Sequence, residues 1–132
     1  MELIKKHILV VDDDPPLRTL FQALLESYGF TSDTADNGGE AITKLTRESY
    51  DAVLLDYMMP EITGLTVLRH IQQRYPSMPV VMLTGHTDSQ VAVQALALGA
   101  RACLYKPFDH RELKEVLNGI VGRVESEHLA ST

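Results

Sequence analysis

Short apolar runs alternate with longer segments of helical spacing along the chain. The runs are rich in Val, Ile and Leu and are bounded by polar or turn-forming residues, which is typical of short buried strands. The runs ILVV, AVLL and VVML are apolar at every position and are the clearest. The pattern predicts strands over residues 8–11, 52–55, 80–83 and, less regularly, 102–105; a weaker candidate covers 30–35, where apolar residues are sparse.

Between the strands, apolar residues recur at the i, i+3, i+4, i+7 positions of one helix face. The clearest face runs from Leu17 to Tyr28, with Asp14 placed to cap its start, two prolines in the first turn and Gly29 after its end. The segment "TDSQ" has the form of a capping box and "DHRE" opens the last helix. Further helices are predicted over 39–47, 65–75, 87–98 and 109–124.

The order of elements is therefore strand then helix, repeated along the chain. Strands that alternate with helices form a parallel sheet with helices on both faces, which is the doubly wound α/β class. Runs that are apolar on both sides of the pleat, such as ILVV and AVLL, belong at the centre of that sheet. We expect one domain over residues 1–124 and a polar tail over 125–132.

Composition narrows the classes of function. The 132 residues carry a net charge of −6 and no basic cluster, so we expect no nucleic-acid binding by this chain. The single cysteine, Cys103, excludes an internal disulfide and a zinc site built from cysteines. No stretch approaches the roughly 20 apolar residues that a membrane span needs. These features predict a cytoplasmic protein with no membrane partner.

Polar residues stand at the carboxyl ends of the predicted strands, where the functional crevice of such a sheet lies. Asp12 and Asp13 follow the first strand, Asp56 the third, Thr84 the fourth and Lys106 the fifth. Two like charges about 4 Å apart repel by roughly 4 kcal/mol at an effective dielectric near 20. A bound cation would offset that repulsion, and carboxylates without His or Cys favour Mg²⁺.

This set of residues also suits phosphoryl chemistry. An aspartate can act as a nucleophile toward phosphorus and form an acyl phosphate, and a metal ion neutralises charge on the phosphoryl oxygens. Lys106 would add a positive charge, and Thr84 could donate a hydrogen bond to a phosphoryl oxygen. No other residue has the pattern of a catalytic base, so the phosphoryl donor would have to be reactive.

The segments "ILVVDDD", "YDAVLLDYMMPEITGL", "VVMLTGHTD" and "GARACLYKPF" occur in the order and spacing of a known family. The chain resembles a receiver domain of a two-component response regulator from about His7 to Val121. The resemblance implies a flavodoxin-like (βα)₅ fold and a histidine kinase or phosphotransfer protein as phosphodonor. It implies a signalling module that assists its own phosphorylation and dephosphorylation, with no turnover of small substrates.

The resemblance also implies a role for each site residue. Asp56 would be the phosphoryl acceptor. Asp13, Asp56 and the backbone carbonyl of Met58 would ligate Mg²⁺, with Asp12 acting through water. Thr84 would be the switch hydroxyl and Lys106 the phosphate partner, with a cis peptide bond between Lys106 and Pro107.

Three positions depart from the family pattern. Cys103 stands where an aromatic residue is usual, and Tyr105 instead adjoins the motif lysine. Met58 cannot orient an attacking water by hydrogen bonding, and Thr63 replaces a frequent acidic residue in a turn. Cys103 is interpreted as a small core residue in preference to a redox sensor.

The histidines show no metal-ligand spacing and are mostly surface candidates. His86, two residues after Thr84, is the exception and could influence loss of the phosphoryl group.

The segment "SQVAVQALALG" is apolar nearly all round. It predicts a partner or homodimer face together with segments 102–105 and 109–124, through which the resemblance implies that the signal leaves.

Other classes of function remain open at this point. A degenerate receiver would bind partners without phosphorylation; the intact acidic set argues against this and Cys103 argues weakly for it. A haloacid-dehalogenase-like phosphatase also uses a D-x-D pattern after its first strand, but Pro16 stands where that family has Thr or Val. A flavin carrier on the same fold would need a phosphate in the first loop, where three aspartates would repel it.

Overall fold

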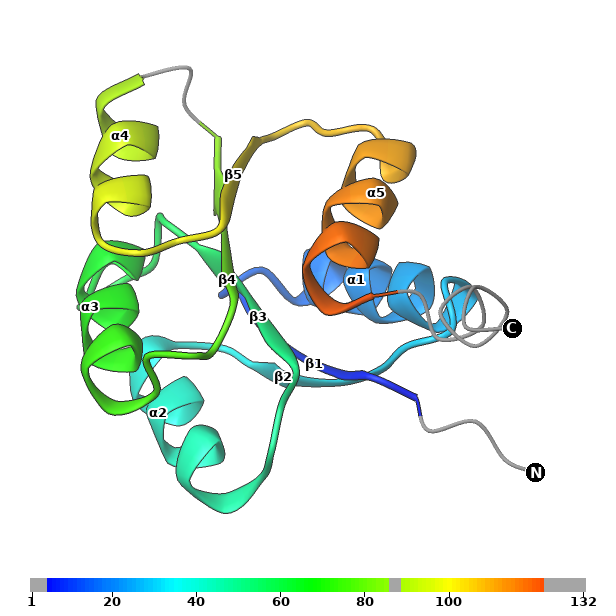
Figure 1. Cartoon of the computed structure of the whole chain (residues 1–132), viewed down its shortest axis with the longest axis horizontal. Coiled ribbons are helices and arrows are strands. Elements are labelled where there is room, and N and C mark those ends of the chain that lie inside the picture. Colours follow the sequence, from blue (N-terminus) through cyan, green and yellow to red (C-terminus); the bar gives the residue numbers. More distant parts are fainter. Residues whose placement is uncertain (1–4, 86–88, 123–132) are drawn as a thin grey trace.

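The computed structural model describes residues 5–85 and 89–122. Strands and helices alternate in the order that the hydrophobic pattern predicts (Figure 1). The elements are β1 (His7–Val11), α1 (Pro15–Ser27), β2 (Thr31–Ala35), α2 (Gly38–Arg47), β3 (Ala52–Asp56), α3 (Gly64–Arg74), β4 (Val80–Thr84), α4 (Ser89–Ala97), β5 (Ala102–Tyr105) and α5 (His110–Val121).

The strands form one parallel sheet in the order β2-β1-β3-β4-β5. Helices α1 and α5 cover one face, and α2, α3 and α4 cover the other (Figure 1). β3 and β4 are buried along their full length, as the apolar runs indicate. β2 lies at an edge, which explains why its sequence TSDTA is mostly polar and buries only Ala35.

The sheet separates two apolar clusters. Ile8 and Val10 of β1 pack against Phe21 of α1 and Leu117 of α5. Leu9 and its neighbours on the opposite side of the pleat pack against α2, α3 and α4. Because both faces of the central strands are covered, the polar residues of β1, β3 and β4 are confined to the strand ends.

The start of α1 differs from the sequence prediction. Asp14 occupies the cap position, but its side chain makes no capping hydrogen bond. Pro15 and Pro16 fill the first two helical positions and have no backbone N–H to donate. The Asp14 backbone N–H instead donates to Asp12 Oδ1 at 3.0 Å. By contrast, Asn37 and Asp109 do cap α2 and α5 with their side chains.

Some predicted features lie outside the described residues, namely His86, Thr87, Val124 and the tail over 125–132. The capping box proposed for the fourth helix begins at Thr87 and is therefore among them. Within residues 5–85 and 89–122, no helix is long and apolar enough to cross a membrane.

Candidate functional site

The carboxyl ends of β1 and β3 bring three aspartates together. Asp12 and Asp13 follow β1, and Asp56 is the last residue of β3. The three side chains place carboxylate oxygens within 4.8 Å of one another. Asp12 and Asp56 are 1% and 4% exposed, whereas Asp13 is exposed. β1 and β3 are hydrogen-bonded neighbours, so the sheet itself sets this proximity.

Lys106, directly after β5, reaches the same point from the other side. Its Nζ donates to Asp56 Oδ1 at 3.0 Å and to Asp12 Oδ2 at 3.2 Å. Its backbone N–H donates to the carbonyl of Thr84 at 2.6 Å, which holds the end of β5 against β4. The peptide bond between Lys106 and Pro107 is cis, as the family resemblance implies.

The charges of this cluster do not balance. The pKa of the Asp56 carboxyl rises from its ordinary value of 3.8 to about 6. Burial is the largest cause; Lys106 opposes it, and the negative charges of Asp12 and Asp13 add to it. Burial alone would lower the pKa of Lys106, but Asp56 and Asp12 outweigh it and the pKa is raised. The excess negative charge favours a further cation at the site.

Asp12 is held in place by backbone contacts that the sequence analysis did not identify. Its backbone N–H donates to the Ala35 carbonyl at 3.1 Å, and Arg18 Nη1 donates to the Asp12 carbonyl at 2.7 Å. Arg18 lies in the first turn of α1, where a cation is unfavourable for the helix dipole. That unfavourable placement is the one sequence signal that could have pointed to Arg18.

The turn after Asp56 depends on Gly64. A Cβ at this position would collide with the Asp56 carbonyl oxygen and lie 2.9 Å from the Tyr57 Cα. The Gly64 backbone N–H donates to the Tyr57 carbonyl at 2.9 Å. Within this turn Glu61 has a φ of 72°, a left-handed conformation that is uncommon for a residue with a side chain. Gly64 therefore allows the turn to pack directly against the end of β3.

Thr84, Met58 and Cys103 differ in how far they are buried. Thr84 is buried at the end of β4 and lies opposite Tyr105 in the sheet register. Met58, two residues past Asp56, has a side chain that is 54% exposed. Cys103 is half-buried and packs against the core under α4, and burial raises the pKa of its thiol. These features match a packing residue and give no sign of an activated thiol.

The donor set of the aspartate cluster suits a hard divalent cation. All its side-chain ligands are carboxylate oxygens, which Mg²⁺ prefers. Two of the carboxylates are buried and share a single ammonium group, so a divalent ion would relieve repulsion that Lys106 leaves uncompensated.

Among the histidines in the described residues, His7 and His70 are half-buried and His110 is exposed, whereas the sequence suggested mostly surface positions. His7 is half-buried at the start of β1 and contacts Thr31 and Asp33 of β2. The sequence could not show this, because the partners become neighbours only when β2 pairs with β1 in its observed register.

Comparison with models of protein families matches residues 8–118 to the response regulator receiver domain. The chain belongs to that family. Receiver domains are signalling domains that interact with histidine kinases or phosphotransfer proteins. Membership decides against the haloacid-dehalogenase-like phosphatase and the flavin carrier.

Curated relatives are transcriptional regulators that are longer than this receiver domain. A CpxR homologue from Haemophilus influenzae is 45% identical over 90% of this chain and 52% of the relative. PhoP from Bacillus subtilis is 37% identical over 92% of this chain and 51% of the relative. NtrC from Salmonella typhimurium is 35% identical over 91% of this chain but 26% of the relative. The chain thus spans about half or less of the length of these relatives.

Solved structures agree with the fold. A CheY-like receiver domain from Methanospirillum hungatei gives a TM-score of 0.86 at 30% identity, covering 94% of this chain and 99% of that one. The response regulator TrrA from Thermotoga maritima, solved with Mg²⁺ and BeF, gives a TM-score of 0.80 at 36% identity, covering 87% and 98%. The predicted flavodoxin-like (βα)₅ class is therefore confirmed.

Proposed function

We propose that this receiver domain is switched by phosphorylation of Asp56, with a histidine kinase or phosphotransfer protein as donor and Mg²⁺ as cofactor. The observation that carries the proposal is the environment of Asp56: buried, beside two further carboxylates, and in contact with the Lys106 ammonium. The receiver domain is proposed to extend over residues 1–124.

In the proposed transfer, an Asp56 carboxylate oxygen attacks the phosphorus of the donor phosphohistidine. The new bond is an acyl phosphate O–P bond, and the P–N bond to the imidazole breaks, with its electron pair returning to the ring nitrogen. Asp56 must be ionised to attack, and Lys106 favours the ionised form. Lys106 then pairs with a phosphoryl oxygen in place of the Asp56 carboxylate.

Asp13, Asp56 and the Met58 carbonyl would hold Mg²⁺, with Asp12 acting through water, and the ion would supply positive charge to neutralise the phosphoryl oxygens. The Thr84 hydroxyl donates to one of these oxygens and thereby couples the phosphoryl group to the end of β4. Because the Thr84 carbonyl accepts from the Lys106 backbone, a shift at Thr84 is passed to β5.

The proposed output face consists of α4, β5 and α5. Its exposed apolar side chains are Val93 and Leu96 of α4, at 64% and 51%, and Tyr105 of β5, at 37%. We expect this face to bind a partner or a second copy of the chain after phosphorylation. Light scattering with and without a beryllofluoride analogue tests the homodimer; a mass independent of analogue and of protein concentration would exclude it.

The acceptor role is tested by incubation with Mg²⁺ and acetyl phosphate, followed by intact mass measurement. The wild type should gain one base-labile phosphoryl group, and Asp56→Asn should gain none. Asp36→Asn is a matched control, because Asp36 is an exposed aspartate that follows the carboxyl end of β2, as Asp12 and Asp13 follow that of β1. An equal adduct on Asp56→Asn would disprove the assignment. No adduct from acetyl phosphate or from several histidine kinases would favour a phosphorylation-independent binding module.

A further inference from the structure

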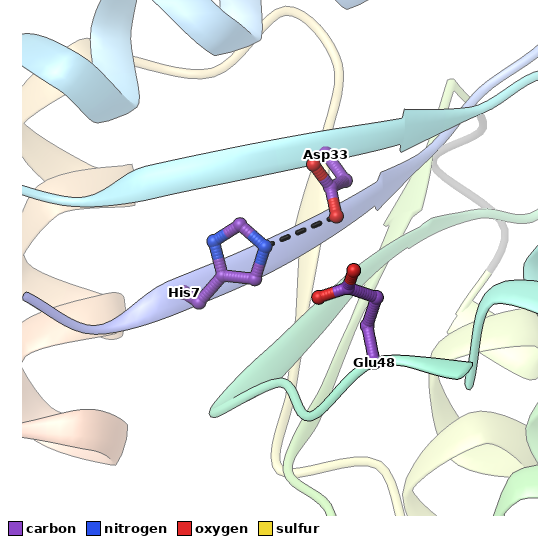
Figure 2. A group of neighbouring side chains, drawn as sticks. All are labelled: His7, Asp33 and Glu48. Carbon is purple, nitrogen blue, oxygen red and sulfur yellow. Dashed lines mark hydrogen bonds and ion pairs between the residues drawn. The ribbon is translucent and has the colours of Figure 1, made fainter. Parts of the chain in front are cut away.

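A second group of metal-ligating side chains lies at the other end of the sheet. His7 begins β1, Asp33 is in the middle of β2, and Glu48 follows α2. A strand rises about 3.3 Å per residue, so the five-residue β1 separates His7 from Asp12 by roughly 16 Å. The three side chains converge beside the edge strand, with the Glu48 carboxylate directed toward the other two (Figure 2).

We propose that His7, Asp33 and Glu48 form a binding site for a divalent transition-metal ion of the zinc type. One ligand atom from each side chain lies within 4.8 Å of the other two. Metal–ligand distances of about 2.0–2.2 Å in a tetrahedral zinc site place ligand atoms about 3.4 Å apart. His7 Nε2 and Asp33 Oδ2 are already 3.0 Å apart. Glu48 is exposed and can close the remaining distance by rotating its side chain.

The imidazole of His7 is oriented by contacts on its other side. Its Nδ1 lies 2.6 Å from Thr31 Oγ1, and its ring stacks on Tyr50 with centroids 5.0 Å apart and an interplanar angle of 10°. In the metal-free protein Nε2 donates to Asp33 Oδ2. A metal ion at Nε2 would displace that proton, and a proton on Nδ1 donated to Thr31 would leave the Nε2 lone pair for the ion. Metal-bound histidines characteristically donate their second ring N–H to such a partner.

Asp33 is oriented in the same way. The Tyr50 hydroxyl donates to Asp33 Oδ2 at 2.7 Å. Burial would raise the pKa of the Asp33 carboxyl, but hydrogen bonds from Tyr50 and His7 outweigh it and hold the pKa below its ordinary value. Asp33 is therefore an anion at neutral pH, as a metal ligand must be.

The ligand chemistry distinguishes this site from the aspartate cluster. An imidazole nitrogen with two carboxylates suits zinc and similar ions, whereas the carboxylates at Asp56 suit Mg²⁺. Two carboxylates and a neutral imidazole carry a charge of −2, which a divalent ion balances. Lys44 is a nearby cation, but its Nζ donates to the Thr34 carbonyl and lies 3.7 Å from Glu40.

The experiment is calorimetric titration of the full chain with Zn²⁺ in excess Mg²⁺, which occupies the aspartate cluster. The wild type should bind one Zn²⁺, and His7→Gln and Glu48→Gln should each weaken that binding by at least about tenfold. His110→Gln is the matched control, because His110 is exposed at the start of α5 and is not part of this group. The Zn²⁺ affinities of His110→Gln and of Asp56→Asn should equal that of the wild type.

A second readout separates metal binding from damage to the fold. Glu48 is exposed, so Glu48→Gln should leave the metal-free denaturation midpoint unchanged. Zn²⁺ should raise that midpoint in the wild type and much less in Glu48→Gln, because a ligand that binds only the folded state stabilises it. Absence of Zn²⁺ binding, or equal affinity in Glu48→Gln and the wild type, would overturn the proposal. The contact between His7 and Asp33 would then be a hydrogen bond alone.

Discussion

The Lys106 ammonium lies 3.0 Å from Asp56 Oδ1 and 3.2 Å from Asp12 Oδ2, so one positive charge is shared by two buried carboxylates. This arrangement keeps the acceptor candidate anionic without neutralising the site. The unshared negative charge is available to a metal ion, and the ammonium is available to a phosphoryl group.

Replacement of Lys106 by methionine should destabilise the metal-free protein. It leaves two buried carboxylates without their ammonium partner, and we expect the free energy of unfolding to fall by about 1–3 kcal/mol at pH 7. Mg²⁺ should restore part of this loss. Urea denaturation with EDTA and with Mg²⁺ measures both effects, and Lys5→Met, at an exposed position, is the control. Equal loss in the two variants would contradict the role of the shared ammonium.

Replacement of Asp56 by asparagine should stabilise the metal-free protein at neutral pH. The folded-state pKa of about 6 exceeds the ordinary 3.8, so the folded state prefers the protonated carboxyl. The penalty for ionisation therefore appears as pH rises from about 4 to about 6 and is fully present above that range. We expect a gain of about 1–3 kcal/mol at pH 7.5 that shrinks toward pH 4. Denaturation in EDTA across this range measures it; a gain that grows as pH falls would show that the sign is wrong.

Gly64→Ala should destabilise the protein because the added methyl group meets the backbone at the end of β3. Backbone atoms cannot move aside as a flexible side chain can, and overpacking of this kind costs about 1–3 kcal/mol. Gly119→Ala is the matched control: Gly119 lies inside α5 with open space around it. That change should stabilise the protein by about 0.5–1 kcal/mol. Denaturation midpoints of the two variants should therefore move in opposite directions.

The Cys103 thiol should react slowly with a disulfide reagent at pH 8. Burial raises the pKa of the thiol, so little of the reactive thiolate is present. The side chain also packs against the core under α4, which shields it from the reagent. We expect the rate to be at least about tenfold below that of the same chain in denaturant. A rate in the folded protein equal to that of the denatured chain would indicate a reactive cysteine in place of a packing residue.

The hydrophobic pattern was sufficient to predict a doubly wound parallel sheet, because β3 and β4 are covered on both faces and their sequences are unbroken apolar runs. The same reasoning placed Asp12, Asp56 and Lys106 close together, because the carboxyl ends of parallel strands lie at the same end of a sheet. The flavodoxin-like class came from the resemblance to receiver domains. β2 was the weakest prediction, and its edge position explains why its sequence is polar.

Other features depend on three-dimensional contacts that no local pattern encodes. The contact between Arg18 and the Asp12 carbonyl, and the close approach of Gly64 to Asp56, exist only after the chain turns back on itself. The expected side-chain cap from Asp14 does not form, and Pro16 removes the N–H at the second helical position, one of the two donors that such a cap uses. The His7 group required knowledge of which residues of β1 and β2 are paired.

Chemical mapping of the phosphoryl adduct identifies the aspartate that accepts the phosphoryl group. The protein is treated with acetyl phosphate and Mg²⁺, reduced with borohydride to convert an acyl phosphate to an alcohol, and digested for peptide mass analysis. We predict homoserine at position 56 and unmodified aspartate at positions 12 and 13. Homoserine at position 12 or 13, with Asp56 intact, would show that Asp56 is not the acceptor.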